Sequence, residues 1–142
     1  MRHLKFFLVL ILSILTVFSS CEKVEKKVEI ETSDNLEQFG ILGKWKLETR
    51  TINGITDLSI QCCDYIIFKP DSEPDNLKGE FTASGVGYET NGVFELNPSN
   101  SIIYFNYDNS QKSYEFQISD NLTTFTYNEN NQEIIEDWRK EE

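Results

Sequence analysis

The most regular pattern in the chain is an alternation that begins near residue 44. One face carries Trp45, Leu47, Thr49 and Thr51, and the other carries Lys44, Lys46, Glu48 and Arg50. A period of two is typical of a strand with one buried and one solvated face. We therefore expect Trp45 and Leu47 to point into a core and Arg50 to point to solvent.

Seven further segments have the composition of short strands: Tyr65–Lys69, Glu80–Ser84, Gly92–Leu96, Ile102–Tyr107, Tyr114–Ile118, Leu122–Tyr127 and Glu133–Arg139. Turn-forming residues separate them, among them Asn53-Gly54, Asn91-Gly92, Asp108 to Ser110, Asp120-Asn121 and Asn128 to Asn131. Ser33 to Gly40 predicts one capped helical turn before the first strand. Eight short strands without a long helical pattern predict an all-β domain over residues 36–142, an eight-stranded antiparallel up-and-down barrel.

Alternation within each predicted strand selects the residues that we expect to point inward. They are Trp45, Leu47, Tyr65, Ile67, Phe94, Tyr104, Tyr114, Phe116 and Phe125. In a barrel of this size the interior is either packed solid or holds one small ligand. If it holds a ligand, the members of this set near the open end line the pocket.

The first 20 residues have the layout of a secretory signal. A basic start (Arg2, Lys5) leads into an apolar run that ends near Phe18 and is shorter than the roughly 18 residues of a membrane-spanning helix. The segment Phe18-Ser19-Ser20-Cys21 resembles a lipobox, which implies cleavage before Cys21 and a lipid anchor on that cysteine. Cleavage after Ser19, giving a soluble secreted protein, is the alternative. Residues 21–35 are rich in alternating charges, and we interpret them as a solvated tether.

Charge and composition narrow the chemistry. The chain has a net charge of −11, and removing residues 1–20 leaves 11 basic against 24 acidic residues, a net charge of −13. This acidity without a basic cluster argues against nucleic acid as a partner. His3, the only histidine, lies in the signal segment, so we expect neither Ser-His-Asp nor Cys-His catalysis, and neither a metal nor a cofactor.

Two groups invite chemistry but have simpler interpretations. Glu136 shares a face with Ile134 and Trp138 and would be partly buried there, but no substrate site accompanies it. We favour an outer-face charge and no enzymatic activity. Adjacent strand residues point to opposite faces, so Cys62 and Cys63 favour one buried and one exposed thiol. A strained disulfide between them and an intermolecular bridge are the alternatives.

The segment Leu42-Gly43-Lys44-Trp45-Lys46-Leu47 resembles the opening strand of the lipocalin-like domain of Bacteroidetes lipoproteins. The resemblance implies that Gly43 and Trp45 close one end of the barrel and that Arg139 packs across Trp45. It also implies a cup for a small apolar ligand on a protein anchored in the cell envelope, in the outer membrane at its periplasmic or surface face. We expect a monomer. The alternative function is a protein-interaction or structural module with a filled barrel and no ligand.

The lipid anchor has a direct test. Replacing Cys21 with Ser removes the thiol that would be acylated, and inhibiting the lipoprotein signal peptidase blocks cleavage before Cys21. Either treatment is therefore expected to leave the protein unprocessed or to release it from the membrane. Fractionation of cells into membrane and soluble material measures this. Unchanged attachment and processing would contradict the anchor.

Overall fold

The computed structural model describes residues 36–59, 63–73 and 76–142, all within a compact unit that spans Thr32–Glu142. The predicted signal segment, Cys21 and the predicted tether lie outside the described residues. The strands are β1 (Gly43–Ile52), β2 (Ile55–Thr56), β3 (Tyr65–Pro70), β4 (Lys78–Gly85), β5 (Tyr88–Asn97), β6 (Ile102–Tyr107), β7 (Ser110–Ser119), β8 (Leu122–Glu129) and β9 (Gln132–Lys140). One 3-10 turn, Pro98–Asn100, joins β5 to β6.

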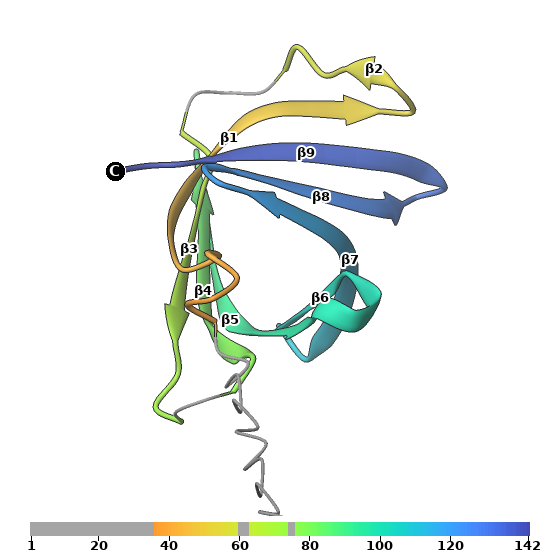
Figure 1. The fold of residues 1–142 in the computed structure, drawn as a ribbon. Helices are drawn as coiled ribbons and strands as arrows, with labels where there is room; N and C mark the ends of the chain where they lie inside the picture. Colours follow the sequence, from red (N-terminus) through yellow and green to blue (C-terminus); the bar gives the residue numbers. More distant parts are fainter. Residues whose placement is uncertain (1–35, 60–62, 74–75) are drawn as a thin grey trace, which may run out of the picture. The chain divides into compact units, whose positions relative to one another are not determined.

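The strands form one closed antiparallel ring. Neighbours in sequence pair from β3 to β9, and β1 pairs with β3 on one side and with β9 on the other. Figure 1 shows β1, β8 and β9 on one side of this ring and β3, β4 and β5 on another, with β6 and β7 between them. The short β2 pairs only with the end of β1 and lies outside the eight-membered ring. The predicted eight-stranded antiparallel barrel is therefore confirmed, and β2 is an addition that alternation did not reveal.

The segment before β1 closes one end of the barrel. Residues 36–40 form a turn with a hydrogen bond from Gly40 N to Glu37 O (3.2 Å), and the predicted start of a helical turn at Ser33 lies outside the described residues. Leu36 and Ile41 are buried in the core, and the indole Nε1 of Trp45 donates to Ile41 O at 2.7 Å. We call this the closed end. The opposite, open end carries the turns at 53–54, 86–87, 108–109 and 130–131.

One predicted turn is wrong. Asn91-Gly92 lies inside β5, and the β4–β5 hairpin instead turns at Val86-Gly87. A Cβ on Gly92 would lie 2.4 Å from Asn106 O and 2.7 Å from the ring of Phe81. Gly92 is thus required because neighbouring strands and a core ring approach it closely, a role that looks the same as a turn signal in sequence.

Three residues of the predicted inward set point outward. Ile66 and Phe68 are buried in β3, so Tyr65 and Ile67 face the exterior, and burial of Ile103 and Phe105 places Tyr104 outside in the same way. Both segments carry apolar residues on both faces. Alternation therefore could not determine which face joins the core.

A β-bulge in β1 changes which residues face inward. Leu47 pairs with Trp138 and Thr49 with Asp137, so Glu48 is the extra residue. Beyond this bulge the inward position passes from Thr49 to Arg50, while the Thr49 hydroxyl donates to Asp137 on the outer surface at 2.8 Å. The prediction that Arg50 points to solvent is wrong, because one inserted residue exchanges the two faces of a strand.

The packing role of Gly92 predicts a stability effect. Gly92→Ala is expected to lower the free energy of unfolding by about 1–3 kcal/mol, the usual cost of overpacking a core. Urea denaturation measures it. Val93→Ile adds one carbon at the neighbouring outward position, where the side chain is half exposed, and should change stability by less than about 0.5 kcal/mol. Equal effects of the two substitutions would contradict this account.

Candidate binding site at the open end of the barrel

The barrel interior is not filled along its whole length. A cavity of about 210 Å³ lies toward the open end and is lined by both apolar rings and polar side chains. It is lined by Arg50, Ile66, Phe81, Ala83, Tyr88, Thr90, Phe105, Tyr107, Tyr114, Phe125, Glu136 and Trp138. At about 30 Å³ for one water, this space corresponds to roughly seven water molecules. It therefore suits a small molecule, or one end of a larger one.

A pair of oppositely charged side chains, from the adjacent strands β1 and β9, lies in this part of the interior. Arg50 Nε donates to Glu136 Oε1 at 2.8 Å, and Nη2 lies 2.7 Å from the same oxygen. Glu136 is only 5% exposed. The expectation of an outer-face charge at Glu136 is therefore wrong: Glu136 lies on the buried face of β9 with Ile134 and Trp138. The bulge at Glu48 turns Arg50 inward, directly opposite Glu136.

Two aromatic side chains complete the surroundings of Glu136. The Tyr127 hydroxyl donates to Oε1 at 3.2 Å, and the Trp138 indole Nε1 donates to Oε2 at 3.2 Å. Burial and the nearby Glu136 charge raise the pKa of Tyr127, so its phenol stays protonated and continues to donate. Burial disfavours the charge on Arg50, but the charge and hydrogen bond of Glu136 outweigh it and raise the pKa of Arg50.

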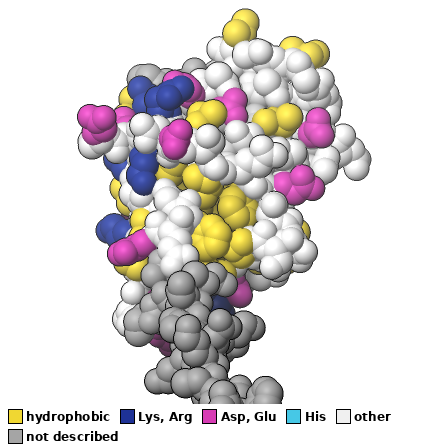
Figure 2. All heavy atoms as spheres, in the orientation of Figure 1, with side chains coloured by type: hydrophobic (Ala, Val, Ile, Leu, Met, Phe, Trp, Pro, Cys, Tyr) yellow, Lys and Arg dark blue, Asp and Glu magenta, His cyan; other side chains and the backbone are white. Residues whose placement is uncertain are grey.

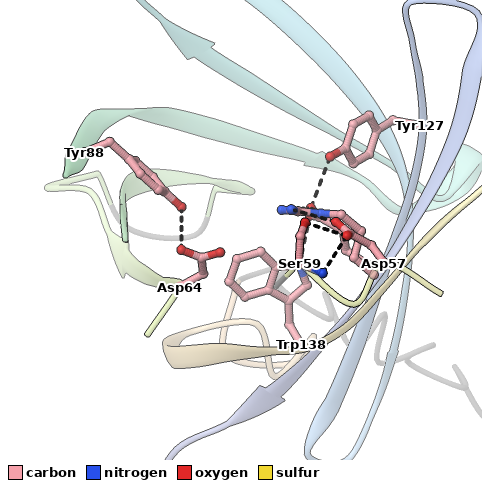
Figure 3. Close-up of polar contacts among 8 residues, drawn as sticks. Asp57, Ser59, Asp64, Tyr88, Tyr127 and Trp138 are labelled. Carbon is pink, nitrogen blue, oxygen red and sulfur yellow. Dashed lines mark hydrogen bonds and ion pairs between the residues drawn. The ribbon is translucent and has the colours of Figure 1, made fainter. Parts of the chain in front are cut away.

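Further acidic groups surround the pair. Asp57 Oδ2 lies 3.8 Å from Arg50 Nη1, and hydrogen bonds from the Ser59 hydroxyl and amide lower the pKa of Asp57. Asp64 accepts a hydrogen bond from the Tyr88 hydroxyl at 3.3 Å. Figure 3 shows this Asp64–Tyr88 contact set apart from the cluster around Asp57, Tyr127 and Trp138.

Only part of the predicted pocket lining is in the pocket. Tyr114 and Phe125 line the cavity. Leu47, Phe94 and Phe116 are buried in the core beside it. Tyr65, Ile67 and Tyr104 face outward, as described above. The residues that the sequence did not indicate are chiefly Arg50, Glu136, Tyr88 and Trp138. For Glu136, its shared face with Trp138 was the available signal.

The residues predicted to close the barrel end divide in the same way. Trp45 is fully buried at the closed end. Gly43 has a φ of 120°, and a Cβ there would lie 3.1 Å from Lys140 Cε, so the position favours glycine on both counts. Lys140 Nζ, and not the Arg139 guanidinium, lies over the Trp45 ring at 5.3 Å. Arg139 points outward and pairs with Glu48 on the surface, because adjacent strand residues face opposite sides.

Other parts of the described chain offer less chemistry. Open depressions of about 370 and 450 Å³ lie outside the cavity, one over the outer face of β3–β5 at Ile67 and Val93, the other beside Phe39 and Pro98. Residues 36–59, 63–73 and 76–142 contain no group of three or more His, Cys, Asp or Glu side chains that could hold a metal. The same ranges contain no helix long and apolar enough to cross a membrane. Cys63 is exposed, and Cys62 lies outside these ranges.

Comparison with known proteins returns no relationship: no family model, no curated protein and no solved structure matches the chain. The geometry of the cavity and the residues of the chain itself are therefore what indicate its function.

The buried ion pair predicts that two carboxylates on the paired strands β1 and β9 differ in their contribution to stability. Glu136→Gln is expected to lower the free energy of unfolding by about 1.5–3 kcal/mol, because Arg50 loses its charged partner in a partly buried place. Glu48→Gln removes the same charge from the exposed pair with Arg139 and should cost far less. Thermal and urea unfolding measure both. Equal losses would show that the Glu136 pair is no more important than a surface pair.

Proposed function

We propose that the protein is a lipid-anchored lipoprotein of the cell envelope whose lipocalin-like barrel binds a small, mainly apolar molecule at its open end. The observation that carries this proposal is the cavity of about 210 Å³ inside the barrel. Its role is binding and not catalysis. The carboxylate within it already accepts hydrogen bonds from Arg50, Tyr127 and Trp138.

The lining of the cavity supports a binding role. Phe81, Phe105 and Phe125 supply apolar surface, with the Phe81 and Phe105 rings in edge contact at 4.9 Å between centroids. Small-molecule sites in proteins combine mostly apolar walls with a few fixed polar groups. Here Arg50 and Glu136 are the fixed polar groups, and their mutual hydrogen bonds hold them in place.

The N-terminal sequence supports the anchor. Phe18-Ser19-Ser20-Cys21 places an acylation site directly before residues 22–34, a polar stretch with three apolar residues. Fully extended, these residues reach about 40–50 Å at the maximal rise per residue. Such a tether would let a barrel take up a ligand close to a membrane without being embedded in it.

A second candidate is a protein-interaction module. Ile55 and Leu58 are 73% and 92% exposed next to β2, and Val86 is 66% exposed in the β4–β5 turn at the open end. Figure 2 shows apolar side chains protruding at the edge of the molecule that carries β2. Exposed apolar groups of this kind favour contact with another surface. In this alternative the partner covers the open end, and the cavity stays empty.

Filling the cavity separates the two candidates. Ala83→Phe places a ring in a space where Ala83 now lines the wall, and a cavity of about 150 Å³ is enough for a benzene ring. We expect at least a tenfold loss of affinity for N-phenyl-1-naphthylamine, a neutral probe that fluoresces in apolar sites. Fluorescence titration of the chain carrying Cys21→Ser measures it, so that no acyl chain competes for the cavity.

Ser84→Phe is the matched control, because Ser84 pairs with the outward-facing Tyr65 and its ring would lie on the outer surface. It should leave probe affinity unchanged. Absence of probe binding to the unmodified cavity, or equal loss in the two variants, would reject the binding role and leave the interaction role.

A further inference from the structure

Among the described residues that line the cavity, Arg50 is the one basic residue, and its charge is already balanced. Arg50 is held by Glu136 through two contacts to Oε1, at 2.8 and 2.7 Å, and its Nη1 lies 3.8 Å from Asp57. A ligand carboxylate or phosphate would have to compete with both acids for the guanidinium. The cavity therefore offers no uncompensated positive charge for an anion.

The wider open end has a strong excess of negative charge. The strand ends and turns that form it carry two basic residues, Arg50 and Lys112, and seven acidic ones: Asp57, Asp64, Glu89, Asp108, Glu129, Glu133 and Glu136. Lys112 is itself paired with Glu129 at 3.0 Å. Both cations are thus engaged by carboxylates, and the remaining acids leave the entrance net negative.

Asp64 is the acid best placed to meet a ligand. Among the described residues, the Tyr88 hydroxyl is the one group that donates to its carboxylate, and no Lys or Arg lies within 4.0 Å of it. Tyr88 lines the cavity, so its hydroxyl contact places Asp64 next to the cavity lining. A Cβ on Gly85 would lie 2.1 Å from Asp64 Oδ1 and 2.3 Å from the Tyr88 ring. Glycine at position 85 is what lets this acid and this ring approach each other.

Aromatic faces surround the same space. Tyr88, Tyr107, Tyr114 and Trp138 all line the cavity. Burial raises the pKa of Tyr114 to about 12, so its ring carries no opposing or competing charge at neutral pH. Aromatic faces attract cations, most strongly where water is excluded. Lys112 Nζ lies 5.9 Å from the Tyr107 ring centroid, so one of these rings already makes a cation–π contact within the protein.

We propose that the ligand is an apolar molecule with a cationic amine at one end. Its apolar part would occupy the space among Phe81, Phe105 and Phe125, and its ammonium group would lie between the aromatic rings and Asp64 and Asp57. This inference rests on the binding role proposed above and adds the chemical class of the ligand. A neutral molecule of the same shape would bind more weakly, and an anion more weakly still.

Three probes with the same eight-carbon chain test the ligand class: octylammonium, octan-1-ol and octanoate. Each is titrated against the chain carrying Cys21→Ser, with displacement of N-phenyl-1-naphthylamine as the readout. Octylammonium is expected to bind at least tenfold more tightly than octan-1-ol, and octanoate at least tenfold more weakly. The preference should shrink between 0.1 M and 1 M NaCl, where the screening length falls from about 10 Å to about 3 Å.

A pair of isosteric variants shows whether the preference is local. Asp64→Asn is expected to lower the ratio of octylammonium to octan-1-ol affinity at least threefold. Asp120→Asn makes the same charge change at the closed end, in a turn whose φ of 47° suits asparagine, and should leave the ratio within twofold.

The possible failures are distinguishable. Octanoate binding as tightly as octylammonium, or Asp120→Asn acting as strongly as Asp64→Asn, would overturn the cationic ligand while leaving a binding cavity. If the probe and all three octyl compounds fail to bind, the binding role itself falls.

Discussion

The structure depends on the seam between β1 and β9, which joins the first and last strands of the barrel. Pairing runs along almost the whole of β1, from Trp45 opposite Lys140 to Ile52 opposite Ile134. Without it the sheet would have two long exposed edges. The seam includes one extra residue, Glu48, and this bulge shifts the inward-facing positions of β1 by one residue. Toward the closed end β1 contributes Trp45 and Leu47 to the core, and beyond the bulge it contributes a guanidinium.

The bulge connects the fold with the proposed function. It places Arg50 opposite Glu136 inside the barrel, and Tyr127 and Trp138 supply the remaining hydrogen bonds of that carboxylate. Buried ion pairs contribute little to stability compared with well-packed apolar residues of similar size. The fold alone therefore gives no reason for a charged pair at this place. We assign it to the proposed binding role, in which a rigid polar group would fix the orientation of a ligand and the compensated Arg50 charge would disfavour anions.

Much of the architecture could be predicted from alternation and turn chemistry, and the site could not. β6 matches its predicted bounds, and the hairpins at Asn109 and Asn131 turn where asparagine predicts left-handed backbone. The prediction that Tyr65 and Tyr104 point inward failed because their strands carry apolar residues on both faces. The prediction that Arg50 points to solvent failed for a different reason: its facing depends on one inserted residue in β1, and a bulge leaves no mark in the composition of a strand. Gly92 resembled a turn signal because close packing and left-handed backbone both require glycine.

The two indole N–H groups give the most direct test of a ligand cavity at the open end. The chain contains two tryptophans. Trp138 lines the cavity and donates to Glu136, and Trp45 donates to Ile41 O at the closed end. Two-dimensional ¹H–¹⁵N NMR of the chain carrying Cys21→Ser resolves both signals during a titration with octan-1-ol. We expect the Trp138 indole signal to move in a saturable way while the Trp45 signal stays in place. A stationary Trp138 signal, or equal movement of both, would contradict a cavity that binds ligand at the open end.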